Sequence, residues 1–244
     1  MHDLKITNQP NTLVDQVEDK LLEYFKSMDL RPGDAIPKEQ ELANALGVGR
    51  SVLREALSRL RMLGWIETRT RRGMILTEPS LLGGMRRVVE PKILGDGALF
   101  DLLGFRVALE IGICELVVNN VTDKHLEDLE DIVKRGIVKS YGEYTPVSEY
   151  EFHTKLYEIT GNKTIMEFQE LIHPVSVFIK EKFKDYFLPV NMELEKSGKR
   201  VTHEDLYEIL KKRDKAGFSK AMTNHFAPYY SFLRRKNNEN NHKL

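Results

Sequence analysis

The stretch ELANALGVGRSVLREAL, residues 41–57, decides the fold of the first domain of this chain. A helical pattern of apolar residues ends at GVG (47–49) and resumes at once, with Arg50 and Arg54 one helical turn apart. Two glycines favour a tight turn between the helices, and the valine between them supplies an apolar side chain to bury there. The stretch therefore predicts a helix-turn-helix whose second helix begins with a basic face.

The second helix of this motif has two unlike faces. Its apolar face is expected to pack against the preceding helix and consists of Leu53, Ala56, Leu57 and Leu60. Its polar face consists of Arg50, Arg54, Ser58 and Arg61, spaced three or four residues apart. In a helix-turn-helix this polar face reaches base edges in the major groove. The alternative is an arginine-rich face that is only solvated.

The surrounding residues complete a winged helix-turn-helix. Helices are predicted at 11–28, 38–46 and 50–63, and short strands at 65–70 and 73–78. The two strands would form a wing, with Arg71 and Arg72 at its tip near phosphates or the minor groove. We therefore assign residues 1–78 to a DNA-binding domain.

Charge is concentrated where this interface is predicted. The whole chain has 37 basic and 37 acidic residues and a formal net charge of zero. Between Arg50 and Gly73, however, seven arginines stand against only two glutamates. Contact with phosphates depends on such a local patch rather than on the average charge of the chain.

Length and composition limit the remaining possibilities. The 244 residues are enough for two domains, and no apolar run approaches the roughly 20 residues that span a bilayer. The N-terminus has no signal-peptide core. The single cysteine, Cys114, lies in an apolar stretch and is interpreted as a core residue. We expect a cytoplasmic protein without a membrane partner.

The rest of the chain is predicted to be a linker followed by a helical bundle. Residues 79–97 are rich in glycine and proline and form the linker, residues 98–236 the bundle, and residues 237–244 a disordered tail. Bundle helices are predicted near 98–119, 122–140, 146–160, 163–186, 201–213 and 215–236. The fold class is thus mainly α.

Ionisable residues on the apolar stripes of these helices predict a metal site. Glu149 and His153 are four residues apart on one helix face, and His203 and His225 are in register with apolar neighbours. Burying these groups is costly unless they pair or bind an ion. One carboxylate and three imidazoles suit Zn²⁺, or another divalent transition metal such as nickel, manganese or iron. The alternative is a set of hydrogen-bonded core histidines.

Arg106 is the candidate effector-binding residue. It precedes Glu110 by one helical turn on an inward face, so the two side chains can form a structural ion pair. Alternatively, its guanidinium binds the carboxylate of an effector bidentately. His173 is kept as a possible neighbour of the site, with a structural role as the first interpretation.

The first domain resembles a known family of DNA-binding proteins. Residues 32–76, PGDAIPKEQELANALGVGRSVLREALSRLRMLGWIETRTRRGMIL, are similar to the winged helix of GntR-type bacterial transcription regulators. The resemblance implies that Arg50, Ser51 and Arg54 approach bases and phosphates, and that Gly73 lets the wing backbone come close to DNA. Gln40 stands where the family commonly has a DNA-contacting arginine, and Gly49 replaces the usual serine cap.

The second domain resembles the FCD effector domain of the FadR branch of these regulators. The similar segments are RVALEIGICELVV (106–118), EYEFHTKLYEITGN (149–162), THEDLYEILKKRD (202–214) and AMTNH (221–225). The resemblance places metal ligands at Glu149, where aspartate is usual, and at His153, His203 and His225. It also implies that a small carboxylate or sugar acid binds beside the metal.

These observations together predict a transcription regulator. We expect a repressor that binds a near-palindromic operator as a homodimer and responds to the organic acid. One alternative is the same architecture sensing the metal itself or a long acyl ligand. A remote alternative is a metal-dependent hydrolase, which would leave the helix-turn-helix unexplained.

Overall fold

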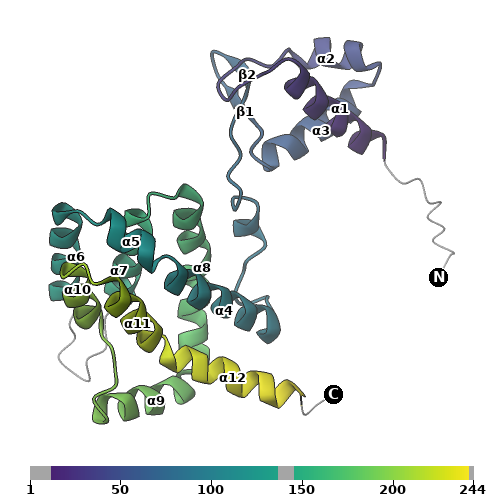
Figure 1. Cartoon of the computed structure of the whole chain (residues 1–244). Helices are drawn as coiled ribbons and strands as arrows, with labels where there is room; N and C mark the ends of the chain where they lie inside the picture. Colours follow the sequence, from purple (N-terminus) through teal and green to yellow (C-terminus); the bar gives the residue numbers. More distant parts are fainter. Residues whose placement is uncertain (1–11, 137–145, 242–244) are drawn as a thin grey trace, which may run out of the picture. The chain divides into compact units, whose positions relative to one another are not determined.

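The computed structural model describes residues 12–136 and 146–241 (Figure 1). It divides into two compact units, Met1–Gly84 and Met85–Leu244, each with its own core. The division falls inside the segment 79–97 that the sequence predicts as a linker. The prediction of a mainly helical protein with a small two-stranded wing is confirmed.

The first unit consists of three helices and a two-stranded sheet. Its elements are α1 (Leu13–Ser27), α2 (Glu39–Leu46), α3 (Arg50–Met62), β1 (Ile66–Arg69) and β2 (Gly73–Leu76). The apolar faces of the three helices meet in one core, as the period of their leucines requires. Leu53, Leu57 and Leu60 of α3 have no exposed surface, so the opposite face of α3 is turned outward.

The turn between α2 and α3 has the predicted construction. Gly47 ends α2 with φ of 65°, a left-handed conformation that glycine adopts without strain. Gly49 is the N-cap of α3, which therefore begins without a side-chain cap. Val48 between them is partly buried against the core, and its backbone N–H donates to Ala43 O at 3.1 Å. The turn thus fixes where Arg50 starts the exposed face of α3.

The wing is an antiparallel hairpin. Ile66 pairs with Leu76 and Arg69 with Gly73, while Ala35 adds an isolated bridge to Ile75. Ile66 and Leu76 are buried in the core of the unit, which attaches the base of the hairpin to the helices. The turn at residues 70–72 is exposed.

The second unit is a bundle of helices preceded by a short 3-10 helix at Met85–Arg87. Its helices are α4 (Asp96–Gly112), α5 (Cys114–Asn120), α6 (Asp123–Gly136), α7 (Pro146–Ile159), α8 (Lys163–Lys182), α9 (Lys184–Lys196), α10 (His203–Lys211), α11 (Lys215–His225) and α12 (Ala227–Asn241). Helix α7 packs between α6 and α8, α10 packs on α6 and α11, and α9 lies against α8 and α12 (Figure 1).

Several predicted helix boundaries need correction. The helix predicted at 98–119 is interrupted at Ile113, directly after Gly112, where glycine weakens helix continuity. The helix predicted at 215–236 is interrupted at Phe226, whose φ of −87° and ψ of 6° depart from helical values and separate α11 from α12. Of the helix predicted at 122–140, residues 137–140 lie outside the described residues.

Helix α9 and the end of α12 were not predicted. No helix was predicted at 187–200, yet α9 continues through Pro189 to Lys196. The predicted disordered tail is wrong for residues 237–241, which extend α12 to Asn241. Once a helix has formed, extending it by a polar residue costs little free energy, because each added residue gains a backbone hydrogen bond. A segment without apolar residues facing the core can therefore continue an existing helix.

No helix in the described part of the chain is long and apolar enough to cross a membrane. Cys114 is buried, as predicted, and burial raises the pKa of its thiol to about 12. The thiol is therefore protonated at neutral pH and behaves as a small core group.

Candidate functional site

The predicted DNA-contacting residues of α3 are at the surface. Arg50 and Ser51 are exposed in its first turn, where the backbone N–H groups and the helix dipole favour phosphate. Arg54 follows one turn later, with 63% of its side chain exposed. Its Nε donates to Glu39 Oε2 at 2.7 Å, and this hydrogen bond orients the guanidinium.

Glu39 was missed in the sequence analysis. It opens α2 and binds two residues of the basic face, because Arg61 Nη2 lies 3.5 Å from its other oxygen. Arg54 and Arg61 hold the pKa of Glu39 below its usual value despite partial burial. The sequence shows only a glutamate at the first position of one helix and arginines in the next helix. That these side chains face each other cannot be recognised before the crossing of the two helices is known.

The arginines of the basic segment differ in their surroundings. Arg59 donates to Asp15 at 2.6 Å and to Glu55 at 3.1 Å, which ties α3 to α1. Arg72 and Gly73 are exposed at the wing tip. Gly73 has φ of 70°, a conformation that strains other residues, so the turn itself requires glycine there. The patch thus contains both structural arginines and arginines available to a ligand.

In the second unit, three histidines that are far apart in the sequence come together. Candidate ligand atoms of His153, His203 and His225 all lie within 4.8 Å of one another. His153 comes from α7, His203 from the first residue of α10, and His225 from the last residue of α11. A capping box between Thr202 and Asp205 begins α10 at His203 and so fixes where this imidazole enters the core.

Two of the rings are oriented by hydrogen bonds on their Nδ1 atoms. His225 Nδ1 donates to the carbonyl oxygen of Val201 at 2.9 Å, and His153 Nδ1 contacts the buried carboxylate of Glu110. Such contacts direct the opposite nitrogen, Nε2, toward a metal. His153 Nε2 is buried and has no hydrogen-bond partner, which is costly without an ion. The residues present therefore fit a transition metal.

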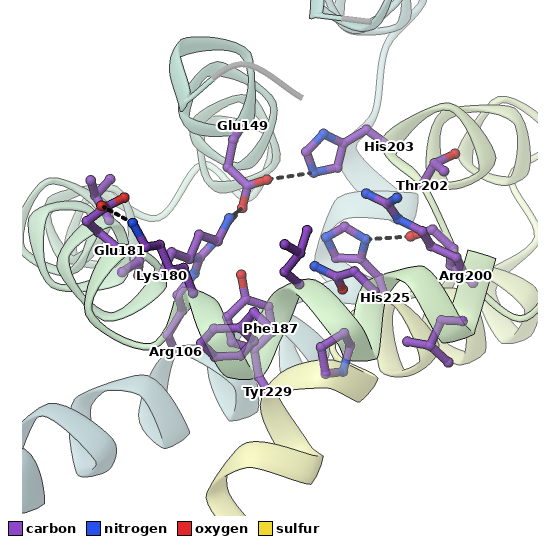
Figure 2. A pocket seen from close by; sticks show the side chains of 18 of the residues that line it. Arg106, Glu149, Lys180, Glu181, Phe187, Arg200, Thr202, His203, His225 and Tyr229 are labelled. Carbon is purple, nitrogen blue, oxygen red and sulfur yellow. Dashed lines mark hydrogen bonds and ion pairs between the residues drawn. The ribbon is translucent and has the colours of Figure 1, made fainter. Parts of the chain in front are cut away.

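Glu149 faces this cluster from α7 (Figure 2). Its Oε1 lies 3.8 Å from His153 Nε2, and its Oε2 lies 3.7 Å from His203 Nε2. Oε1 also accepts from Lys180 Nζ of α8 at 2.5 Å. The carboxylate thus stands between a lysine and two imidazoles. The structure brings the three predicted histidines together and places Glu149 beside two of them.

The electrostatics favour neutral imidazoles and ionised carboxylates. Burial lowers the pKa of His225 to about 4 and that of His203 well below its usual value. Burial alone would raise the pKa of Glu149, but Lys180 and the nearby imidazoles outweigh it and hold that pKa well below its usual value. At neutral pH the cluster therefore offers lone pairs and negative charge to a cation.

Arg106 and Glu110 form a buried ion pair behind the cluster. Arg106 Nε donates to Glu110 Oε1 at 2.7 Å, while Arg106 Nη2 lies 3.9 Å from Glu149 Oε1. Only 4% of the Arg106 side chain is exposed. The structural ion pair considered in the sequence analysis is present; binding of an effector carboxylate by Arg106 stays a prediction.

The cluster opens onto a cavity of about 690 Å³. The cavity is bordered by Glu149 and Tyr150 of α7, Lys180 of α8, Phe187 of α9, His203 and His225, and Tyr229 of α12 (Figure 2). His173 borders it as well, and its ring is tilted against that of Tyr150 with 4.3 Å between ring centroids. His173 is thus a neighbour of the cavity and lies outside the three-histidine cluster.

Comparison with known proteins places both units in one family. The family "Bacterial regulatory proteins, gntR family" matches residues 13–76, and the FCD domain matches residues 101–228. This chain belongs to the GntR family of bacterial regulators. The predicted resemblance is therefore confirmed for both domains, and the chain is a DNA-binding transcriptional regulator of the GntR and FCD type.

The relatives of this GntR regulator are transcription regulators. It is 30% identical to the uncharacterized HTH-type transcriptional regulator YcbG of Bacillus subtilis, over 88% of this chain and 87% of that protein. It is 29% identical to the HTH-type transcriptional regulator LutR of the same organism, over 66% and 73% of the two chains. A GntR structure from Streptococcus agalactiae has the same fold, with a TM-score of 0.51, 24% identity, and coverage of 91% and 100%.

Proposed function

We propose that this GntR regulator is a repressor whose operator affinity is controlled by a small carboxylate or sugar acid bound beside a divalent transition metal. The proposed ligands of the metal are Glu149, His153, His203 and His225, with zinc as first candidate and nickel, manganese or iron as alternatives. The observation that carries the proposal is the convergence of three imidazoles at the edge of a cavity.

The surrounding residues support a bound acid. An ion in this position supplies a Lewis-acidic centre that a carboxylate oxygen can coordinate. Glu110 and the Val201 carbonyl hold two of the imidazoles in orientation, so the cluster needs little rearrangement to bind. Arg106 borders the cavity, and its Nε donates a hydrogen bond to Glu110. Its Nη atoms would then bind the effector carboxylate.

The DNA-binding part of the proposal rests on the exposed residues of α3 and the wing. Arg50, Ser51 and Arg54 would enter the major groove, and Arg72 and Gly73 would contact the backbone beside it. Two copies are needed to read the two halves of a near-palindromic operator, so we propose a homodimer.

Operator titrations at one salt concentration test this function. The full chain is compared metal-free, metal-loaded, and metal-loaded with a panel of organic acids, with metal content measured by elemental analysis. We expect metal to be retained after buffer exchange and the operator affinity to change only when an acid is added. An equal change with metal alone would favour a metal sensor, and absence of metal after loading would favour hydrogen-bonded histidines.

Arg106→Met separates binding of the acid from binding of the metal. It removes the charge while keeping much of the side-chain volume. We expect the folded variant to retain metal, because the imidazoles and Glu149 remain, and to lose its response to acids, because it lacks the guanidinium that would hold the carboxylate. Its free energy of unfolding should fall, because Glu110 loses its buried partner. Unchanged calorimetric affinity for an acid that binds the wild type would leave Arg106 with its structural role alone.

A further inference from the structure

Glu39 is an acid beside the basic face of the DNA-binding unit, and the proposed function gives it no role. It is the first residue of α2, and its side chain is 31% exposed. Its Oε2 accepts from Arg54 Nε at 2.7 Å, and its Oε1 lies 3.5 Å from Arg61 Nη2. A carboxylate next to a phosphate-binding surface opposes DNA binding through its own charge. Any favourable contribution of Glu39 therefore comes through the arginines that it contacts.

Arg61 holds Glu39 from the side of the wing. The Arg61 side chain is 34% exposed, and its Nη2 donates to the sulfur of Met74 in β2 at 3.5 Å. Met74 belongs to the core of the unit, so this arginine links Glu39 to the base of the hairpin. The two arginines lower the pKa of Glu39, which is therefore ionised at neutral pH. Glu39 is a charged acceptor with a defined position.

The contact with Glu39 leaves the outer edge of the Arg54 guanidinium available. Nε is occupied, whereas neither Nη atom of Arg54 donates a hydrogen bond to another residue in the described part of the chain. The two Nη groups donate side by side in one plane, which matches O6 and N7 of guanine in the major groove. Because the Nε contact orients this plane before DNA arrives, less side-chain freedom is lost when the base is bound.

The same contact reduces the attraction of this surface for phosphates. Arg54, Arg61 and Glu39 together carry one net positive charge, whereas the two arginines alone would carry two. Non-specific DNA binding depends on the number of phosphates that are neutralised, while discrimination between sequences depends on directed hydrogen bonds to base edges. Glu39 therefore affects the two kinds of binding in opposite directions.

We infer that Glu39 is a positioning residue that makes α3 selective for guanine. It orients Arg54 toward a guanine in each half of the operator and weakens the binding of the same face to other DNA. Arg54 contacts the base, and Glu39 acts through Arg54 without touching DNA. The inference rests on the docking of α3 in the major groove that is proposed above.

Selection from a pool of duplexes with a randomised central segment tests the inference without a known operator. The full chain is used without added organic acid, and the bound DNA is sequenced. We expect the wild type to select guanine at a fixed position of each half-site, with a preference of roughly 5–150-fold over other bases. Arg54→Ala should abolish this preference.

Glu39→Gln should reduce the preference for guanine about fivefold, the difference between a charge-assisted and a neutral hydrogen bond. Its amide offers one acceptor oxygen to two arginines and turns an N–H group toward one of them. The melting temperature should stay near that of the wild type, because partly exposed ion pairs contribute little to stability.

Binding to DNA that lacks the selected motif should change in the opposite direction. In titrations at fixed salt, we expect Glu39→Gln to bind a mixed-sequence duplex more tightly than the wild type does. The slope of log affinity against log salt should steepen by up to about one, because one negative charge is removed. A variant with a damaged fold would instead bind both kinds of DNA more weakly.

Two further variants separate orientation from charge. Glu55→Gln removes an equal charge from an exposed acid of α3, which pairs with Arg59 at 3.1 Å, and should leave the guanine preference intact. Glu39→Asp keeps the charge on a side chain that is one methylene shorter. It should lower the guanine preference without tighter binding to DNA that lacks the motif, and it answers the question if Glu39→Gln does not fold.

The outcomes separate this inference from the proposed docking of α3. A guanine preference that persists in Arg54→Ala, or a wild-type motif without guanine, contradicts the reading of guanine by Arg54. A preference that is lost in Arg54→Ala and kept in both Glu39 variants contradicts only the role of Glu39. Equal loss in Glu55→Gln and Glu39→Gln would mean that the net charge of the surface determines the preference, and the assignment to Glu39 would be wrong.

Discussion

The two units of this GntR regulator use charged side chains in opposite ways. In the DNA-binding unit the arginines lie at the surface, and their acidic partners, such as Glu39 and Asp15, are partly exposed to water as well. In the FCD unit Arg106 and Glu110 are enclosed in the core. Surface pairs contribute little to stability, whereas breaking a buried pair leaves an uncompensated charge. Substitutions should therefore change affinity in the first unit and change the fold and the metal site in the second.

Removal of one of the clustered imidazoles should have the largest effect, a loss of metal binding. His203→Ala and His225→Ala each delete one of three converging ligands, so we expect stoichiometric metal to be lost, as measured by elemental analysis. The melting temperature should no longer rise on addition of metal, because binding to the folded state is the source of that rise. His173→Ala, beside the cavity but outside the cluster, is the matched control and should retain metal.

Substitution of Glu110 tests the cost of a buried pair directly. Glu110→Gln removes the charge that pairs with Arg106 and leaves one acceptor oxygen for two donors, Arg106 Nε and His153 Nδ1, so unfolding in denaturant should require about 3–5 kcal/mol less. Metal affinity should fall roughly 10–100-fold in the same variant, because the second contact of a ligating histidine orients it. Wild-type stability in this variant would mean that the buried charges contribute nothing to the fold.

Arg54 and Arg59 compare two arginines of the same helix. Arg54→Ala should cost roughly 1–3 kcal/mol of specific operator binding, measured by titration at fixed salt. Arg59→Ala should leave operator binding near that of the wild type, because this guanidinium is occupied by Asp15 and Glu55. If the two variants lost operator affinity equally, the proposed docking of α3 would be wrong.

Substitution in the wing should have the smallest effect on DNA affinity. Arg72→Ala removes one exposed charge at the tip of the hairpin, so binding should weaken similarly on all DNA sequences. The slope of log affinity against log salt should fall by about one. Glu78→Ala, which alters an exposed acid beyond the hairpin, serves as the control and should leave the slope within error.

Much of the architecture could be predicted from local patterns. The turn at residues 47–49 and the period of the leucines in α3 specify both faces of that helix without knowledge of distant contacts. The positions of Glu149, His153, His203 and His225 also followed from their register with apolar neighbours. Each of these inferences uses information contained within one helix.

What the sequence did not reveal depends on pairs of helices. Glu39 binds Arg54 across the crossing of α2 and α3, and Lys180 binds Glu149 across α8 and α7, so neither pair has a signature in sequence spacing. The interruptions at Ile113 and Phe226 are single residues inside continuous helical patterns. Helix α9 contains Pro189, a residue type that disfavours a helix interior, so this segment carries a weak local signal for a helix.

The shared carboxylate of Glu149 has a thermodynamic consequence. While Lys180 holds one of its oxygens, part of its negative charge is unavailable to a metal. An acid whose carboxylate pairs with Lys180 would return that charge, so acid and metal should raise each other's affinity by the same factor. The site would then act as a coincidence detector, and the dissociation constant of either component has meaning only at a stated concentration of the other.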